Sequence, residues 1–235
     1  MAAVLSLGSR QNGRSRRYVR RRLDPFGIKG FRACRWLREC CILKVMEDLF
    51  DFQSLWVMQP GSLPASRARY QIFGGRDREL LASAADVERR GWLPDVVKSI
   101  PDSSMLQIVT AEGDPMMVMV MRYTEWLTEF LDSAGALVGT IAMGDSRRQY
   151  KILDESGQVV GKVIGDLGLR KFSVSDASGS NFATVRKTRA GLLKEMLTSN
   201  DHYKVEFIGP VAPQPLRTLT VMVPIVLDFI LYEPV

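Results

Sequence analysis

Hydrophobic and polar positions repeat in the second half of the chain with a period of 22 residues. The segment Leu131–Gly139 matches Leu153–Gly161 at most positions. An aspartate recurs at Asp132, Asp154 and Asp176, and each is followed by a glycine three residues later. A repeat of this kind indicates one structural unit used several times.

Each Asp-x-x-Gly unit has the composition of a tight turn between two strands. Aspartate is favoured at the first position of a type I turn, and glycine adopts the positive φ that follows it. The flanks are strand-like, as in Tyr150–Leu153 before a turn and Val159–Ile164 after it. Thr110 and Gly113 extend the series one period earlier, and Thr198–Asp201 is a degenerate copy without the glycine. Each unit therefore predicts a β-hairpin followed by a connector.

The stretch before the repeats follows the same pattern less regularly. Trp56–Met58 and Tyr70–Phe73 have the composition of strands, with Pro and Gly turn signals after each. The following segment is either a short helix over Glu79–Glu88 or a return strand over Leu80–Ala84. Gly91–Ser104, which contains two prolines, is expected to be a loop.

Five or six hairpins give about ten to twelve strands, too many for an open sheet with free edges. We therefore expect a closed antiparallel β-barrel of about twelve strands, whose interior is wider than its own side chains can fill. Val221–Tyr232 is apolar around its circumference except for one aspartate, which predicts a helix buried in that interior. Pro224 would then lie in its first turn. The residues expected to be buried in this helix are Val221, Met222, Ile225, Asp228 and Phe229.

Length and composition agree with one large core. The chain has 235 residues, of which 46% are hydrophobic and 25% charged, as in ordinary globular proteins. Its longest uncharged apolar run, Leu219–Leu227, is shorter than the roughly 20 residues of a membrane-spanning helix.

The formal net charge of +6 comes from the first 45 residues. Residues 1–45 contain 12 Lys and Arg against Asp24 and Glu39, whereas the rest contains more acidic than basic residues. We expect residues 1–45 to be a basic, disordered tail and residues 46–235 to form the barrel domain. The tail is interpreted in three ways: as an arm that binds nucleic acid or anionic lipid, as an Arg-rich targeting peptide, or as a mis-assigned start before Met46.

The sequence contains few candidate catalytic residues. All three cysteines lie in residues 1–45, and His202 is the single histidine. No Gly-x-Ser-x-Gly motif, phosphate loop or dinucleotide motif occurs. The aspartates of the repeat are explained by turn geometry, and the methionines of Met116–Met121 by the barrel core. We therefore expect a protein that is not an enzyme and that uses no metal or cofactor.

The C-terminal segment carries a family resemblance. Val221-Met222 and Asp228–Glu233, after a hairpin array, resemble the phospholipid scramblase family and the LURP-one-related proteins of the tubby C-terminal-like superfamily. The likeness covers about Leu49–Glu233. It implies a twelve-stranded barrel around the terminal helix, phospholipid binding, and ATP-independent movement of phospholipids between leaflets. The segment matching the family's calcium site, Asn200–Phe207, holds two carboxylates and a lysine, fewer ligands than calcium usually takes.

In an up-and-down barrel, all the Asp-x-x-Gly turns lie at one end and all the connectors at the other. The turns carry acidic residues, whereas the connectors and nearby strand ends carry basic ones. We expect the basic end to bind anionic phospholipid headgroups or a membrane surface, with the protein in the cytoplasm or at the periphery of its membrane. The candidates are Arg122, Arg147, Arg148, Arg170, Lys171, Arg186, Lys187 and Arg189.

The alternative is a tubby-like module that binds a soluble ligand or a protein and has no membrane role. Nucleic acid is not expected to bind the barrel, because the basic excess lies in residues 1–45.

Overall fold

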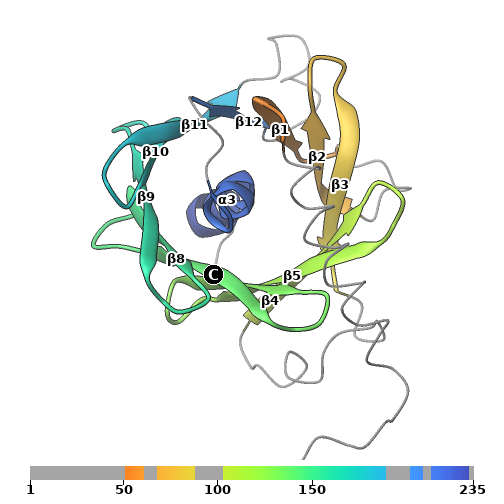
Figure 1. Cartoon of the computed structure of the whole chain (residues 1–235), viewed down its shortest axis with the longest axis horizontal. Coiled ribbons are helices and arrows are strands. Elements are labelled where there is room, and N and C mark those ends of the chain that lie inside the picture. Colours follow the sequence, from red (N-terminus) through yellow and green to blue (C-terminus); the bar gives the residue numbers. More distant parts are fainter. Residues whose placement is uncertain (1–50, 61–67, 88–102, 189–201, 209–212, 233–235) are drawn as a thin grey trace, which may run out of the picture.

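The computed structural model describes residues 51–60, 68–87, 103–188, 202–208 and 213–232 (Figure 1). The tail of residues 1–45 lies outside these ranges, and so does the candidate Arg189.

Twelve antiparallel strands close into a barrel around one helix (Figure 1). Each strand pairs with its neighbours in sequence, and β1 also pairs with β12 to close the sheet. The predicted fold class is therefore confirmed. The strands are β1 (Ser54–Met58), β2 (Ala68–Gly74), β3 (Glu79–Asp86), β4 (Ser103–Thr110), β5 (Pro115–Arg122), β6 (Leu127–Asp132), β7 (Leu137–Met143), β8 (Gln149–Asp154), β9 (Val159–Gly165), β10 (Lys171–Asp176), β11 (Asn181–Thr188) and β12 (His202–Phe207), and the helix is α3 (Leu216–Tyr232).

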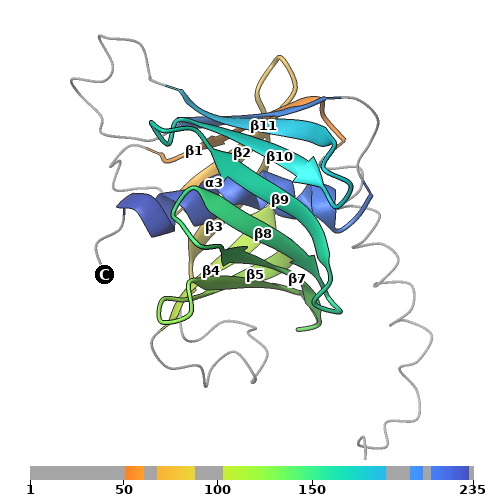
Figure 2. The same ribbon diagram turned by 90° about the vertical axis from the view of Figure 1, so that its left-hand side faces the viewer.

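The two ends of the barrel differ in the loops that they carry. At the turn end lie the short links β2–β3, β4–β5, β6–β7, β8–β9 and β10–β11, and at the connector end lie the links between the other consecutive strands. The helix α3 begins at the turn end, where β12 finishes, and runs through the barrel toward the connector end (Figure 2).

The repeated turns have the predicted geometry. Gly135, Gly157 and Gly179 have φ values of 84°, 81° and 88°, and each donates its N–H to the carbonyl of the aspartate three residues before it. The aspartate carboxylate closes the turn from the other side: Asp154 Oδ1 accepts the N–H groups of Ser156 and Gln158 at 2.9 Å each. The period of 22 residues is thus the period of a hairpin with a glycine in the left-handed region.

Replacing Gly157 with alanine tests this requirement. The added Cβ would meet no atom within 4 Å, so the cost comes from the positive φ alone, about 1 kcal/mol of unfolding free energy. Gly168→Ala is the matched control, since its φ is not in the left-handed region and its Cβ would meet only Asp166 Oδ1, at an ordinary contact distance of 3.9 Å. We expect urea denaturation to show the loss for Gly157→Ala and no loss for Gly168→Ala. Equal stability of the two variants would contradict the turn assignment.

The helix α3 is longer than the pattern predicted. It starts at Leu216 rather than Val221. Gln214 Oε1 accepts a hydrogen bond from the hydroxyl of Thr218 at 2.8 Å, which stabilises the additional first turn. Pro224 therefore lies inside the helix, not in its first turn. The predicted helix residues Val221, Met222, Ile225, Asp228 and Phe229 are each at most 1% exposed.

The helix is packed tightly against the barrel wall at two strand glycines. A Cβ on Gly139 of β7 would lie 2.5 Å from the carbonyl oxygen of Leu153 and 2.7 Å from Leu219 Cδ1. A Cβ on Gly161 of β9 would lie 2.6 Å from Leu216 Cδ1. Unlike the turn glycines of the repeat, these two lie within strands. They recur because the wall and the helix approach each other there.

Other details correct or settle the sequence-based expectations. The segment after β2 is a strand, β3, not a helix, and Ser103 and Ser104 belong to β4 rather than to a loop. The degenerate copy at Thr198–Asp201 lies outside the described residues, and β12, which follows it, starts at the connector end, where His202 pairs with Thr188. His202 is therefore a strand residue, not a turn residue. The methionines of β5 are buried in the core, as expected.

Candidate functional site

The structure gathers most of the candidate cations at the connector end. Arg147 and Arg148 lie in the β7–β8 connector, Arg170 lies in the β9–β10 connector, and Lys171 begins β10; all four are exposed. Backbone hydrogen bonds hold the neighbouring connectors together: Gly165 donates to the carbonyl of Arg148 at 2.7 Å. Two adjacent connectors thus present four cations to solvent.

A further cation stands beside this group on the outer face of the barrel. Arg186 of β11 is exposed, and it lies directly opposite Lys171 of β10 on one side and Lys204 of β12 on the other. Lys204 donates to Glu206 Oε1 at 2.7 Å. We call Arg147, Arg148, Arg170, Lys171 and Arg186 the cationic cluster.

The other two described candidates, Arg122 and Lys187, contact other side chains of the protein. The guanidinium of Arg122 contacts Glu129 Oε2 through Nη2 at 2.8 Å and Nε at 3.1 Å. Lys187 pairs with Tyr203 across β11 and β12, and its Nζ lies 5.7 Å from the centre of the Tyr203 ring. Arg122 and Lys187 are therefore less accessible to an external anion than the side chains of the cationic cluster.

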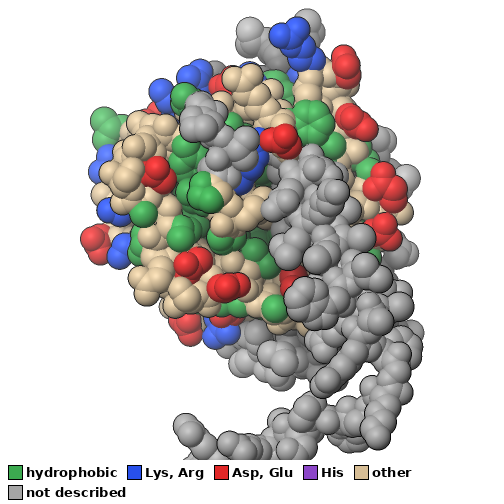
Figure 3. Space-filling model, in the orientation of Figure 1, with side chains coloured by type: hydrophobic (Ala, Val, Ile, Leu, Met, Phe, Trp, Pro, Cys, Tyr) green, Lys and Arg blue, Asp and Glu red, His purple; other side chains and the backbone are tan. Residues whose placement is uncertain are grey.

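Acidic side chains dominate the opposite, turn end of the barrel. The six predicted residues lie in its turns or at their edges, and Figure 3 shows acidic side chains around the rim of this face. The hydroxyl of Ser156 and the turn N–H groups lower the pKa of Asp154, and Ser178 does the same for Asp176. These carboxylates are fixed in the turns as anions. The six residues are Glu112, Asp114, Asp132, Asp154, Glu155 and Asp176.

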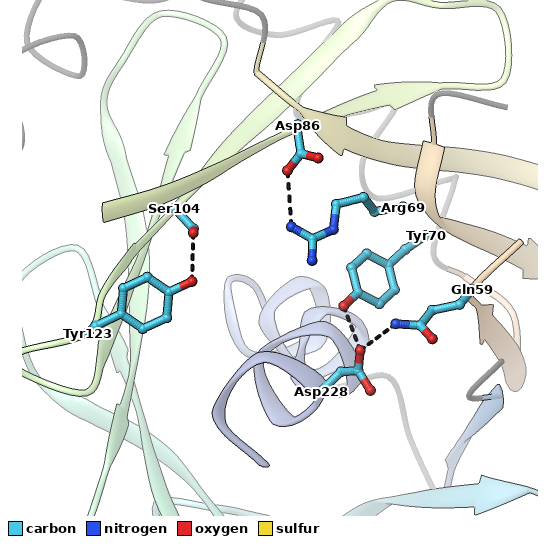
Figure 4. A network of polar contacts seen from close by, with 7 residues as sticks. All are labelled: Gln59, Arg69, Tyr70, Asp86, Ser104, Tyr123 and Asp228. Carbon is cyan, nitrogen blue, oxygen red and sulfur yellow. Dashed lines mark hydrogen bonds and ion pairs between the residues drawn. The ribbon is translucent and has the colours of Figure 1, made fainter. Parts of the chain in front are cut away.

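A buried polar network lies inside the barrel, toward the connector end. Asp228 of α3 accepts hydrogen bonds from Gln59 Nε2 at 2.6 Å and from the hydroxyl group of Tyr70 at 2.7 Å (Figure 4). The hydroxyl group of Tyr203 donates to the same carboxylate at 3.3 Å. Burial raises the pKa of Tyr70, and the charge of Asp228 raises it further, so the phenol remains a donor. The sequence analysis missed these partners; their signal is the acid in an otherwise apolar helix, which burial obliges to be hydrogen-bonded.

Arg69 covers the last turns of α3 at the same end. Its guanidinium carbon lies 4.7 Å from the centre of the Phe229 ring, and Nη1 contacts Asp86 Oδ1 at 3.1 Å (Figure 4). Because the C-terminal end of a helix carries partial negative charge, this position favours a cation. Arg69 therefore helps to hold the helix in the barrel.

The described residues form no cluster for a metal ion. Within the described ranges, no group of three or more His, Cys, Asp or Glu side chains is placed to hold a metal ion. None of the helices in those ranges is long and apolar enough to cross a membrane. The features that stand out are the cationic cluster and the network around Asp228.

Comparisons with known proteins identify the family to which this chain belongs. A comparison with curated proteins gave no match. Among solved structures, a protein from Arabidopsis thaliana is similar with a TM-score of 0.49 and 12% identity, over 76% of this chain and 91% of that one. A family model described as Scramblase matches residues 97–234, which is more than half of the chain. The resemblance drawn from the terminal helix is thereby confirmed, and the chain belongs to the scramblase family.

Proposed function

We propose that the connector end of the barrel binds anionic phospholipid headgroups at a membrane surface. The observation that carries the proposal is the cationic cluster, in which five exposed Lys and Arg side chains come from adjacent loops and strands. The opposite end presents acidic turns, so the two ends of the barrel differ in charge. Membership of the scramblase family supports a lipid as the ligand.

The strength of such binding follows from its electrostatics. Each Lys or Arg near an anionic bilayer contributes about 1 kcal/mol, and the attraction falls off within a Debye length. Glu125, Asp145 and Asp166 are exposed at the same end and oppose part of it, although Asp166 Oδ1 accepts the N–H of Arg170 at 2.9 Å. Binding should therefore depend on anionic lipid and weaken with salt. The cytoplasmic leaflet supplies that surface.

The proposal covers headgroup binding rather than movement of lipid between leaflets. A headgroup that crosses a bilayer needs a polar path through protein. The barrel interior is filled by α3, whose residues from Leu216 to Ile230 are buried against the wall. Lipid transport by this chain would need an arrangement other than the closed barrel.

Flotation of the full-length chain on vesicles tests the proposal. We expect flotation with anionic vesicles, little with neutral vesicles, and release at high salt. Since the tail is also basic, the decisive variant replaces all 12 Lys and Arg side chains of residues 1–45 with glutamine. The proposal predicts that this variant still floats with anionic vesicles. Loss of flotation in this variant would assign lipid binding to the tail, and no flotation of either chain would favour the module that binds a soluble ligand.

A further inference from the structure

The β9–β10 connector carries a solvent-exposed leucine, Leu167, next to residues of the cationic cluster. Leu167 is 89% exposed, more than any other large hydrophobic residue that is described. Ile164, on the outer face of β9 just before the connector, is 53% exposed. Single exposed apolar side chains are common on protein surfaces; what distinguishes Leu167 and Ile164 is that they lie next to the connectors that carry the cationic cluster.

The connector is a firmly built turn that points one leucine outward and one inward. Asp166 donates its N–H to the carbonyl of Lys171 at 2.8 Å, and Leu169 donates to the carbonyl of Asp166 at 3.2 Å. Leu169 has a φ of 53° and packs against the core. Leu167 stands two residues before it, at the exposed tip. The exposure of Leu167 is therefore a property of an ordered turn.

Hydrogen bonds of the backbone join this tip to three residues of the cationic cluster. Arg148 accepts the N–H of Gly165, and Arg170 and Lys171 donate their N–H groups to Asp166 Oδ1 at 2.9 and 3.3 Å. The loop's own carboxylate is thus turned back onto the loop. Around the tip, the side chains of Arg148, Arg170 and Lys171 are exposed, as is that of Asp145 in the neighbouring connector. An apolar tip within a cationic rim matches the chemistry of an anionic bilayer, which has charged headgroups above apolar chains.

We propose that Leu167 inserts into the bilayer interface when the connector end binds an anionic membrane, with Ile164 entering beside it. This inference rests on the proposed function and adds to it the part of the barrel that enters the lipid. The cations of the cluster contact headgroups, and the leucine contributes apolar burial that salt does not screen. The proposal fixes the orientation of the barrel, with its connector end toward the membrane and its turn end away from it.

The first test compares Leu167→Gln with Ile208→Gln in the full-length chain. Ile208 is a matched control, because it is 53% exposed and follows β12 at the turn end. On vesicles of phosphatidylcholine with about 30% phosphatidylserine, losing the burial of a leucine should lower affinity about tenfold. Ile208→Gln should bind like the original chain. Both replacements are neutral, so the charge of the protein is unchanged.

The second test measures whether position 167 enters the bilayer, rather than how tightly the protein binds. Cys34, Cys40 and Cys41 are replaced with serine, and a single cysteine at position 167 or 208 carries an environment-sensitive fluorophore. The label at 167 should shift to shorter wavelength on anionic vesicles and be quenched by lipid-borne quenchers, whereas the label at 208 should do neither.

The outcomes separate this inference from the proposed function. Salt-sensitive binding with a label at 167 that stays in water, or with unchanged affinity of Leu167→Gln, would overturn the insertion of Leu167 and leave headgroup binding intact. No binding of the original chain to anionic vesicles would overturn both.

Discussion

Adding one methyl group at Gly139 should cost about 3 kcal/mol of unfolding free energy, since overpacking of a closed core is expensive. The new Cβ would lie 2.5 Å from the carbonyl oxygen of Leu153, which is backbone and cannot move aside without breaking β7–β8 pairing. It would also meet Leu219 Cδ1. Urea denaturation followed by intrinsic fluorescence measures the loss.

Gly161 provides a contrast within the same variant series. Its Cβ would meet the tip of Leu216 at 2.6 Å, and the backbone oxygen of Ser175 only at 3.0 Å. Shortening the helix residue should therefore relieve the clash. We expect Gly161→Ala combined with Leu216→Ala to be more stable than the two single losses predict, by about 1 kcal/mol. Gly139→Ala with Leu219→Ala should show a smaller recovery. Wild-type stability of Gly139→Ala would contradict the packing of α3 against the wall.

Removing the carboxylate of Asp228 should also destabilise the barrel strongly. Asp228→Ala leaves the hydroxyl of Tyr70 buried without its acceptor and opens a cavity beside Gln59 and Tyr203. The donors left without this acceptor and the cavity together cost about 3 kcal/mol or more. The measurement is the same urea denaturation.

A second substitution separates the network from simple loss of volume. Asp228→Leu combined with Tyr70→Phe removes the acceptor together with one of its two buried hydroxyl donors, so the Tyr70 hydroxyl is not left without its acceptor. We expect this double variant to recover part of the stability lost in Asp228→Leu alone, because replacing both partners with apolar groups can be nearly neutral. No recovery would mean that Asp228 stabilises the helix by other contacts.

The barrel itself could be predicted because its signals are local. Each Asp-x-x-Gly turn encodes its own hairpin, and repetition of the turn encodes the up-and-down order of the strands. The helix was predicted because apolar residues surround its axis. Its first five residues, Leu216–Thr220, were missed because Arg217 and two threonines interrupt the apolar pattern. The threonine hydroxyls donate locally, to Gln214 Oε1 and to the carbonyl of Leu216. Arg217 finds its partner only in the fold, where Nη2 donates to the carbonyl of Phe52 at 3.0 Å.

The candidate site could be predicted only in outline. Alternation of turns and connectors placed the cations at one end, since topology alone decides which loops share an end. Which cations are available depends on contacts between residues that are adjacent only in the fold, as for Arg122 and Glu129. The partners of Asp228 come from β2, β12 and the residue after β1. No spacing in the sequence relates them.

The most direct test of lipid binding by the connector end is a pair of matched charge reversals in the full-length chain. One variant changes Arg147, Arg148, Arg170 and Lys171 to glutamate. The other changes four cations on the turn end and the side wall and so alters the net charge equally. Each set includes one arginine over a tryptophan ring, Arg147 over Trp126 in the first and Arg78 over Trp56 in the second. The control set is Arg76, Arg78, Lys151 and Lys162.

Both variants are made in a chain whose 12 Lys and Arg side chains in residues 1–45 are replaced with glutamine, and flotation on anionic vesicles is measured at low salt. We predict that the connector-end variant no longer floats and that the control variant floats as the unreversed chain does. Equal flotation of the two variants, whether retained or lost, would contradict the assignment of headgroup binding to the connector end.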